Sequence, residues 1–111
     1  MNDLLNKKCK PCEGGIPGLT LAEAKQLTVK IPGWTLDEAT MRISRSCHFK
    51  NYYETMAFVN AIAWISHRED HHPDLEVSYN RCVVQYSTHA VKGLTENDFI
   101  CAAKVNRLLE E

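Results

Sequence analysis

Apolar residues recur at the three- and four-residue spacing of an amphipathic helix in three stretches of the chain. The predicted helices cover residues 20–31, 52–70 and 95–109. The first and the last begin with a capping-box pattern, in which a threonine is followed three residues later by a carboxylate: Thr20 with Glu23, and Thr95 with Asp98. Pro73 disfavours helical conformation in the residue before it, so it ends the middle helix.

The middle helix carries two neighbouring apolar stripes. They consist of Tyr52, Met56, Val59 and Ala63, and of Phe58, Ile62 and Ile65. Together they are wider than packing against a single sheet face requires. We therefore expect this helix to be covered on a second side by another subunit.

Between the helices the apolar period changes to two, which predicts strands. These strands cover residues 34–36, 41–47, 75–79 and 82–86. Asn80 and Arg81 predict a tight hairpin turn between the last two strands, and Gly93 predicts a turn after the fourth. Arg45 interrupts the alternation of the second strand. Short connections favour antiparallel pairing, so the order α-β-β-α-β-β-α predicts an α+β fold: a four-stranded antiparallel sheet with three helices packed on one face.

The chain has 111 residues, which suits one domain with one core. Proline and glycine interrupt any periodicity near the N-terminus, so we expect an irregular lead-in over residues 1–19 and a single domain over residues 20–111.

Composition excludes several classes of protein. Lys and Arg total 13 against 14 Asp and Glu, and this balance argues against nucleic acid as a direct partner. The longest uncharged run, Thr55 to Ser66, is shorter than the roughly 20 residues that span a bilayer. No apolar run follows the N-terminal lysines, so no secretory signal is predicted, and the odd number of cysteines fits reduced thiols in a cytoplasmic protein.

Cys9 and Cys12 form a C-x2-C pair in the lead-in. No second pair follows at zinc-ribbon spacing, and the glycines and prolines that follow do not open a helix, as a thioredoxin-like motif requires. We expect an unstructured, occasionally oxidised pair. The other three cysteines, at apolar positions of the pattern, are predicted core residues: Cys47, Cys82 and Cys101.

Three histidines stand at the ends of predicted elements. His71 and His72 close the long helix, and His89 follows the fourth strand. If the two hairpins pair side by side, these ends converge at one edge of the sheet. Imidazole titrates closest to neutrality, so the set predicts an acid–base site. Asp98 has two open interpretations: it holds the tautomer of one imidazole, or it only caps its helix.

A metal site is the rival chemical interpretation. His67 and His71 have the spacing that places two zinc ligands on one helix face, and His89 or Asp98 would complete three ligands. The zinc-peptidase motif, however, requires Glu directly after its first His, and Arg68 stands there. A zinc-dependent hydrolase that uses His67 and His71 is therefore the weaker alternative.

The stretch from His67 to Asp98 resembles the signature of the pterin-4a-carbinolamine dehydratase family. The matching positions are the His71-His72-Pro73 run, Tyr79, the Thr88-His89 pair and the G-L-T-x-x-D run that ends at Asp98. The flanks I-P-G-W at 31–34 and F-K-N-Y at 49–52 are similar as well. The first signature position is often Glu in the family, so an anionic role there does not carry over to His67, which would instead stack on or hydrogen-bond the substrate.

The resemblance implies a dehydratase that uses neither metal nor cofactor. The substrate would be a 4a-hydroxytetrahydropterin released by an aromatic amino acid hydroxylase, and the product a quinonoid dihydropterin that a reductase recycles. His71 and His89 would be the proton-transfer pair, and His72 would position the pterin and polarise its hydroxyl. Thr88 and His89 would also contact the pterin, and Asp98 would orient His89.

Members of the family also assemble as homodimers or homotetramers through sheet edges and long helices. Some animal relatives bind a homeodomain transcription factor as a dimerisation cofactor. A protein-interaction module is therefore the alternative function that the resemblance implies.

Overall fold

A computed structural model describes residues 3–11 and 16–110 of the chain. Its elements are, in order, η1 (Asp3–Asn6), α1 (Leu21–Thr28), β1 (Thr35–Asp37), β2 (Arg42–His48), α2 (Tyr52–Glu69), β3 (Asp74–Val77), β4 (Arg81–Tyr86), η2 (His89–Val91) and α3 (Glu96–Leu108). The predicted α+β class and the order of helices and strands are confirmed, and the short 3₁₀ helices η1 and η2 are additions.

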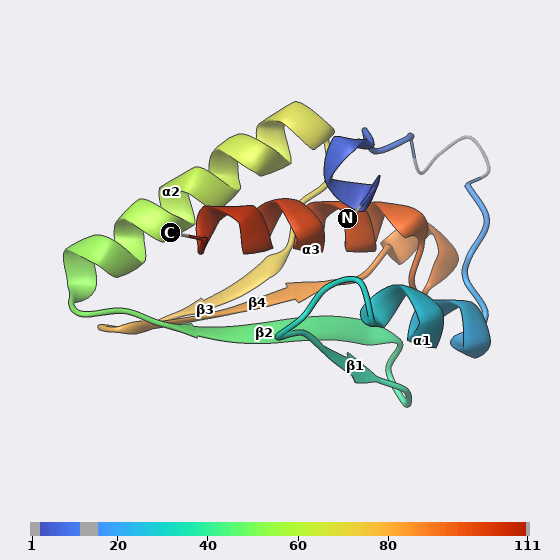
Figure 1. Ribbon diagram of the computed structural model, residues 1–111, viewed down its shortest axis with the longest axis horizontal. Helices are drawn as coiled ribbons and strands as arrows, with labels where there is room; N and C mark the ends of the chain where they lie inside the picture. The colour runs from blue at the N-terminus through green and yellow to red at the C-terminus, as the bar shows by residue number, and fades with distance from the viewer. Residues whose placement is uncertain (1–2, 12–15, 111) are drawn as a thin grey trace.

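The four strands form one antiparallel sheet in the order β1-β2-β4-β3. The two hairpins therefore join through β2 and β4, where Cys47 lies opposite Cys82. Figure 1 shows α2 and α3 lying across one face of the sheet, with α1 near β1 at one end. The core fills the space between these layers, and its fully buried members include Ile43, Ile62, Val84, Tyr86, Phe99 and Val105.

Local capping fixes the ends of the helices. The capping box at α1 is present: the Thr20 N–H donates to Glu23 Oε1 at 2.8 Å, and the Glu23 N–H donates to Thr20 Oγ1 at 3.2 Å. At the far end of α2, Asp70 adopts the left-handed conformation with φ 51°. This cap ends α2 at Glu69, one residue earlier than predicted, so His71 lies outside the helix.

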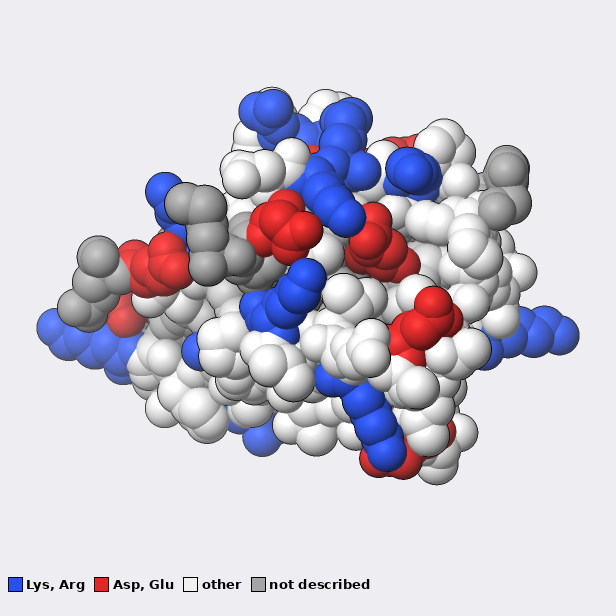
Figure 2. Space-filling model, turned by 45° about the vertical axis from the view of Figure 1, so that its right-hand side comes forward, with Lys and Arg blue, Asp and Glu red and all other residues white. Residues whose placement is uncertain are grey.

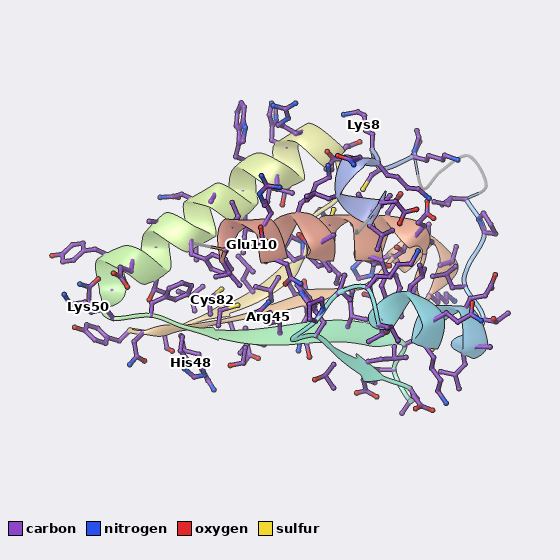
Figure 3. The ribbon with its side chains drawn as sticks, viewed as in Figure 1. Lys8, Arg45, His48, Lys50, Cys82 and Glu110 are labelled. Carbon is purple, nitrogen blue, oxygen red and sulfur yellow. The ribbon has the colours of Figure 1, made fainter. Side chains whose placement is uncertain are left out.

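Arg45 occupies an inward position of β2 and keeps the alternation of the strand. Figure 3 shows Arg45 on the helix side of the sheet and His48 on the opposite side. The Arg45 guanidinium donates to Asn106 Oδ1 at 2.6 Å, which fastens β2 to α3. Gly33 leaves room for this guanidinium: its φ is 89°, and a Cβ there would lie 2.8 Å from Arg45 Cζ.

Two turns differ from the prediction. The Ser78 N–H donates to the Arg81 carbonyl, and Arg81 already belongs to β4, so the hairpin turn lies one residue earlier in the chain. After β4 the left-handed residue is Lys92, with φ 51°, and Gly93 instead pairs with Thr88.

The N-terminal segment has more structure than its composition indicates. Within the predicted lead-in, η1 packs against α3, and Leu4 is only 1% exposed. Cys12 lies outside the described residues, so the expectation for the C-x2-C pair can be followed only at Cys9.

The surface bears mixed charge. On the face shown in Figure 2, Lys and Arg side chains are interspersed with Asp and Glu. Among the described residues, none of the helices has the length and apolar character needed to cross a bilayer.

Candidate active site

A cleft of about 190 Å³ opens where the end of α2 meets the end of β4. Its lining residues are Asp70, His71, His72, Ser87, Thr88, His89 and Ala90. The structure therefore brings the three predicted imidazoles together within a single chain. A larger cavity of about 410 Å³ shares no lining residue with this cleft and contains no imidazole, and its Arg45 and Asn106 already bond each other.

His71 is held on two sides. Its ring is nearly parallel to that of Tyr86, with an interplanar angle of 10° and a centroid separation of 5.8 Å. Its Nε2 lies 2.7 Å from Asp98 Oδ1, and the residue is only 8% exposed. A carboxylate in this position fixes the orientation and the tautomer of an imidazole.

Asp98 connects this histidine to the start of α3. Its side chain is fully buried, and Oδ2 accepts hydrogen bonds from the Thr95 N–H at 2.9 Å and the Thr88 hydroxyl at 2.8 Å. Asp98 therefore caps α3 and also contacts an imidazole, so capping is not its only contact. The contacted imidazole is that of His71, whereas the expectation was His89.

His72 and His89 are exposed, and in sequence both lie between the buried residues His71 and Asp98. A tight loop places His89, because the Thr88 N–H donates to the Gly93 carbonyl at 2.7 Å and the Lys92 N–H donates to the His89 carbonyl at 3.1 Å. Thr88 lines the cleft but is 2% exposed, and its hydroxyl contacts both Asp98 and Thr95.

His67 lies outside the lining of the cleft. It is exposed on α2 and its ring contacts that of Trp64, with centroids 5.3 Å apart. Because α2 ends at Glu69, His67 and His71 do not share a helix face, and the zinc-helix geometry is absent. Over residues 3–11 and 16–110, no group of three His, Cys, Asp or Glu side chains is arranged to hold a metal ion.

Tyr86 is a site residue that the sequence analysis placed only in a strand. Its hydroxyl is buried without a hydrogen-bond partner in the described part of the chain. Burial, together with nearby Cys101, Cys9 and Asp98, raises the pKa of Tyr86 well above its ordinary value, so the phenol stays neutral. The period-two pattern places Tyr86 on the inward face at the end of its strand. This was the one feature of the sequence that could have indicated a role for Tyr86 near the site.

Comparison with known proteins gives a consistent result. The family described as "Pterin 4 alpha carbinolamine dehydratase" matches residues 17–108. A relative from Nitrosomonas eutropha is 63% identical over 108 residues, covering 96% of this chain and 94% of the relative. One from Nitrosomonas europaea is 62% identical over 109 residues, covering 97% and 95%. Both relatives are named as candidate pterin-4-alpha-carbinolamine dehydratases.

A solved structure has the same fold. The crystal structure of a transcriptional coactivator/pterin dehydratase from Brucella melitensis superposes with a TM-score of 0.81 at 31% sequence identity. The match covers 85% of this chain and 100% of that chain.

Proposed function

Because the chain belongs to the pterin-4a-carbinolamine dehydratase family and is a hydro-lyase, we propose that its histidine cleft carries out the elimination. The substrate is a 4a-hydroxytetrahydropterin and the product a quinonoid dihydropterin. The observation that carries this proposal is the convergence of His71, His72 and His89 in one cleft, with a buried carboxylate behind His71.

The elimination requires two proton movements and no electron transfer. The C4a–O bond breaks as the hydroxyl receives a proton and leaves as water, while the proton on N5 is removed and a C4a–N5 double bond forms. Groups that exchange protons near neutral pH suit both movements, and imidazoles are the side chains with this property.

His71 and His89 form the proposed proton-transfer pair. The Asp98 carboxylate fixes the orientation of the His71 ring and holds its edge toward α3. His89, exposed at the start of η2, exchanges the second proton. His72 positions the pterin from the exposed side of the cleft, and Thr88 acts through Asp98.

We place this reaction in the recycling of a pterin cofactor, as the resemblance implies. The substrate is the hydroxylated pterin that an aromatic amino acid hydroxylase releases, and the quinonoid product is returned to the tetrahydro form by a reductase. A coupled assay tests this role. When this protein is added to a hydroxylase that releases the hydroxylated pterin, we expect the pterin to be dehydrated faster.

Rapid mixing with 4a-hydroxytetrahydropterin tests the site. His71→Ala and His89→Ala should each lower kcat by about 10²–10⁴-fold, the usual size of a general acid–base contribution. His48→Ala is the matched control, because His48 is exposed on the opposite side of the sheet. Circular dichroism establishes that each variant is folded.

Two results would contradict the proposal. Wild-type rates in folded His71→Ala and His89→Ala proteins would exclude proton transfer by these imidazoles. A rate that falls on exhaustive chelation and returns with added zinc would replace imidazole catalysis by metal catalysis.

Association with other proteins is the second candidate function, and exposed aromatic residues on α2 favour it. Tyr53 is 81% exposed and Trp64 is 60% exposed. We propose that a second copy of the chain covers this face, giving a homodimer or homotetramer. The description of the Brucella melitensis protein as a transcriptional coactivator concerns that protein. For this chain, binding of a different protein in place of self-association would support the interaction-module alternative.

A further inference from the structure

We propose that Cys9 and Cys101 form a reversible disulfide that fastens the N-terminal segment, residues 3–10, to α3. Their sulfur atoms lie 3.6 Å apart, although 92 positions separate the two residues in the chain. An S–S bond is about 2.05 Å long, so the sulfurs must approach by about 1.5 Å. The inference concerns a modification site and does not depend on the reaction proposed above.

The chain around Cys9 is already held against α2 and α3. The Cys9 N–H donates to Glu69 Oε1 at 2.8 Å. At the next residue, the Lys10 N–H donates to Asn97 Oδ1 at 3.0 Å, and Asn97 Nδ2 donates back to the Lys10 carbonyl at 2.7 Å. These bonds keep the two thiols at high effective concentration, so closing the bond requires little loss of chain entropy.

The rest of the segment follows the same surface. Leu4 is buried at 1% exposure, and Lys7 Nζ lies 3.0 Å from Glu96 Oε2. Lys8 Nζ donates to the Arg68 carbonyl at 2.9 Å, and Figure 3 shows Lys8 beside the C-terminal end of α2. Oxidation therefore fixes an arrangement that the reduced protein already has.

The two thiols differ in access. Cys9 is half-buried, whereas Cys101 is fully buried. The hydrogen bond with Cys9 and, next, burial raise the pKa of Cys101 far above its ordinary value, so Cys101 does not react first. That hydrogen bond is lost once the Cys9 sulfur enters a mixed disulfide, which makes Cys101 available for the second step.

A second close pair shows why exposure matters. Cys47 and Cys82 face each other across β2 and β4, but both are buried in the core. Burial and the neighbouring Cys47 raise the pKa of Cys82 to about 11. Without an exposed thiolate to begin the exchange, this pair stays reduced in the folded protein.

The oxidant is a low-molecular-weight disulfide, here glutathione disulfide. The Cys9 thiolate attacks it, forms a mixed disulfide and releases one glutathione thiolate. The Cys101 thiolate then attacks the Cys9 sulfur and displaces the second glutathione. The two protein thiols are oxidised, lose two protons in total, and one glutathione disulfide is reduced to two glutathione molecules.

Peptide mapping identifies the bond. The folded protein is incubated with glutathione disulfide, remaining thiols are alkylated, and the chain is cleaved after glutamates. Cys9 and Cys12 then lie in the peptide 1–13, and Cys101 lies in the peptide 97–110. We expect these two peptides to be joined, with Cys12 alkylated, and their combined mass to be about 2 Da below the sum of the peptide 1–13 alkylated at Cys12 alone and the reduced peptide 97–110.

Variants provide a second measurement. Oxidation should raise the melting temperature of the wild-type protein and of Cys12→Ser by about 5 °C or more, because a long loop is closed. Cys9→Ser and Cys101→Ser should show no such shift. Cys9→Ser alters a half-buried side chain and remains informative if Cys101→Ser fails to fold.

Three results would overturn the proposal. The first is an internal Cys9–Cys12 bond within the peptide 1–13 in place of the joined peptides. The second is complete alkylation of Cys9 and Cys101 after incubation with the oxidant. The third is a Cys9–Cys101 bond that forms only after denaturation.

Discussion

Replacing Asp98 by asparagine should separate orientation of His71 from capping of α3. The carboxylate is buried and accepts hydrogen bonds from Thr88 and Thr95 on one oxygen, while the other oxygen lies 2.7 Å from His71 Nε2. The asparagine side chain would have nearly the same shape but only one acceptor oxygen. If that oxygen continues to cap α3, the amide NH₂ faces His71 and requires the opposite imidazole tautomer.

The expected effects follow from these contacts. Hydrogen bonds to a charged group contribute about 1.5–3 kcal/mol each, and Asp98→Asn keeps the two capping bonds in weakened form. The free energy of unfolding should therefore fall by about 2–4 kcal/mol. With the imidazole in the wrong tautomer, kcat should fall by about 10²–10⁴-fold. KM should change by less than about 3-fold, because Asp98 does not line the cleft.

Two matched variants make the comparison specific. Thr88→Val removes one donor to Asp98 but leaves the His71 contact, so it should cost about 1–2 kcal/mol of stability with less than about a 10-fold loss of kcat. Asp74→Asn changes an exposed carboxylate at the start of β3 and should alter neither quantity. Urea titration measures stability, and rapid-mixing kinetics measure kcat and KM.

A wild-type kcat in folded Asp98→Asn protein would refute the reasoning. Asp98 would then be a helix cap alone. Equal losses of kcat in Asp98→Asn and Thr88→Val would also refute it, since the contact with His71 would carry no separate effect.

Three further predictions concern stability and assembly. Gly33→Ala should lower the free energy of unfolding in urea by about 1–3 kcal/mol, and Arg45→Ala should reduce that cost; equal costs in both backgrounds would contradict the close contact. Burial raises the pKa of Glu69, but contacts with Cys9 and nearby lysines outweigh it and lower the pKa from 4.5. The difference in free energy of unfolding between wild type and Glu69→Gln should thus be constant above about pH 5 and decrease as the pH falls below 4.5. A difference that increases in acid would contradict a lowered pKa of Glu69. Trp64→Glu should reduce the mass measured by light scattering, and a wild-type monomer at micromolar concentration would exclude a second copy on α2.

Much of the fold was predictable because its signals are local. The capping box at Thr20 and Glu23 marks the start of α1, and the alternation before and after α2 indicates the two hairpins. The convergence of His71 and His89 followed from the hairpins pairing through β2 and β4, which a short-connection sheet favours.

The partner of Asp98 was not predictable from spacing. Capping places this residue in the first turn of α3, but the position of that turn relative to the imidazoles depends on how α3 packs across the sheet. The end of α2 is a similar case, since the left-handed Asp70 ends the helix at Glu69, two residues before the limit that Pro73 sets.

The order of residues 3–10 was also invisible in the sequence. The segment is too short to show a period, and its structure depends on distant partners such as Glu69 and Asn97. The inward position of Arg45 was unpredictable for the same reason, because its hydrogen-bond acceptor, Asn106, lies far away in the sequence, in α3.

The docked N-terminal segment has a practical consequence for preparing fragments of the protein. The region shared with the family begins at residue 17, and a recombinant version trimmed to that boundary would omit Leu4 and the backbone donor to Glu69. Such a version would expose an apolar patch on α3. It would also remove a hydrogen bond from the last turn of α2, which directly precedes the cleft residues Asp70 and His71. The packed unit of this chain therefore begins well before the boundary of the family match at residue 17.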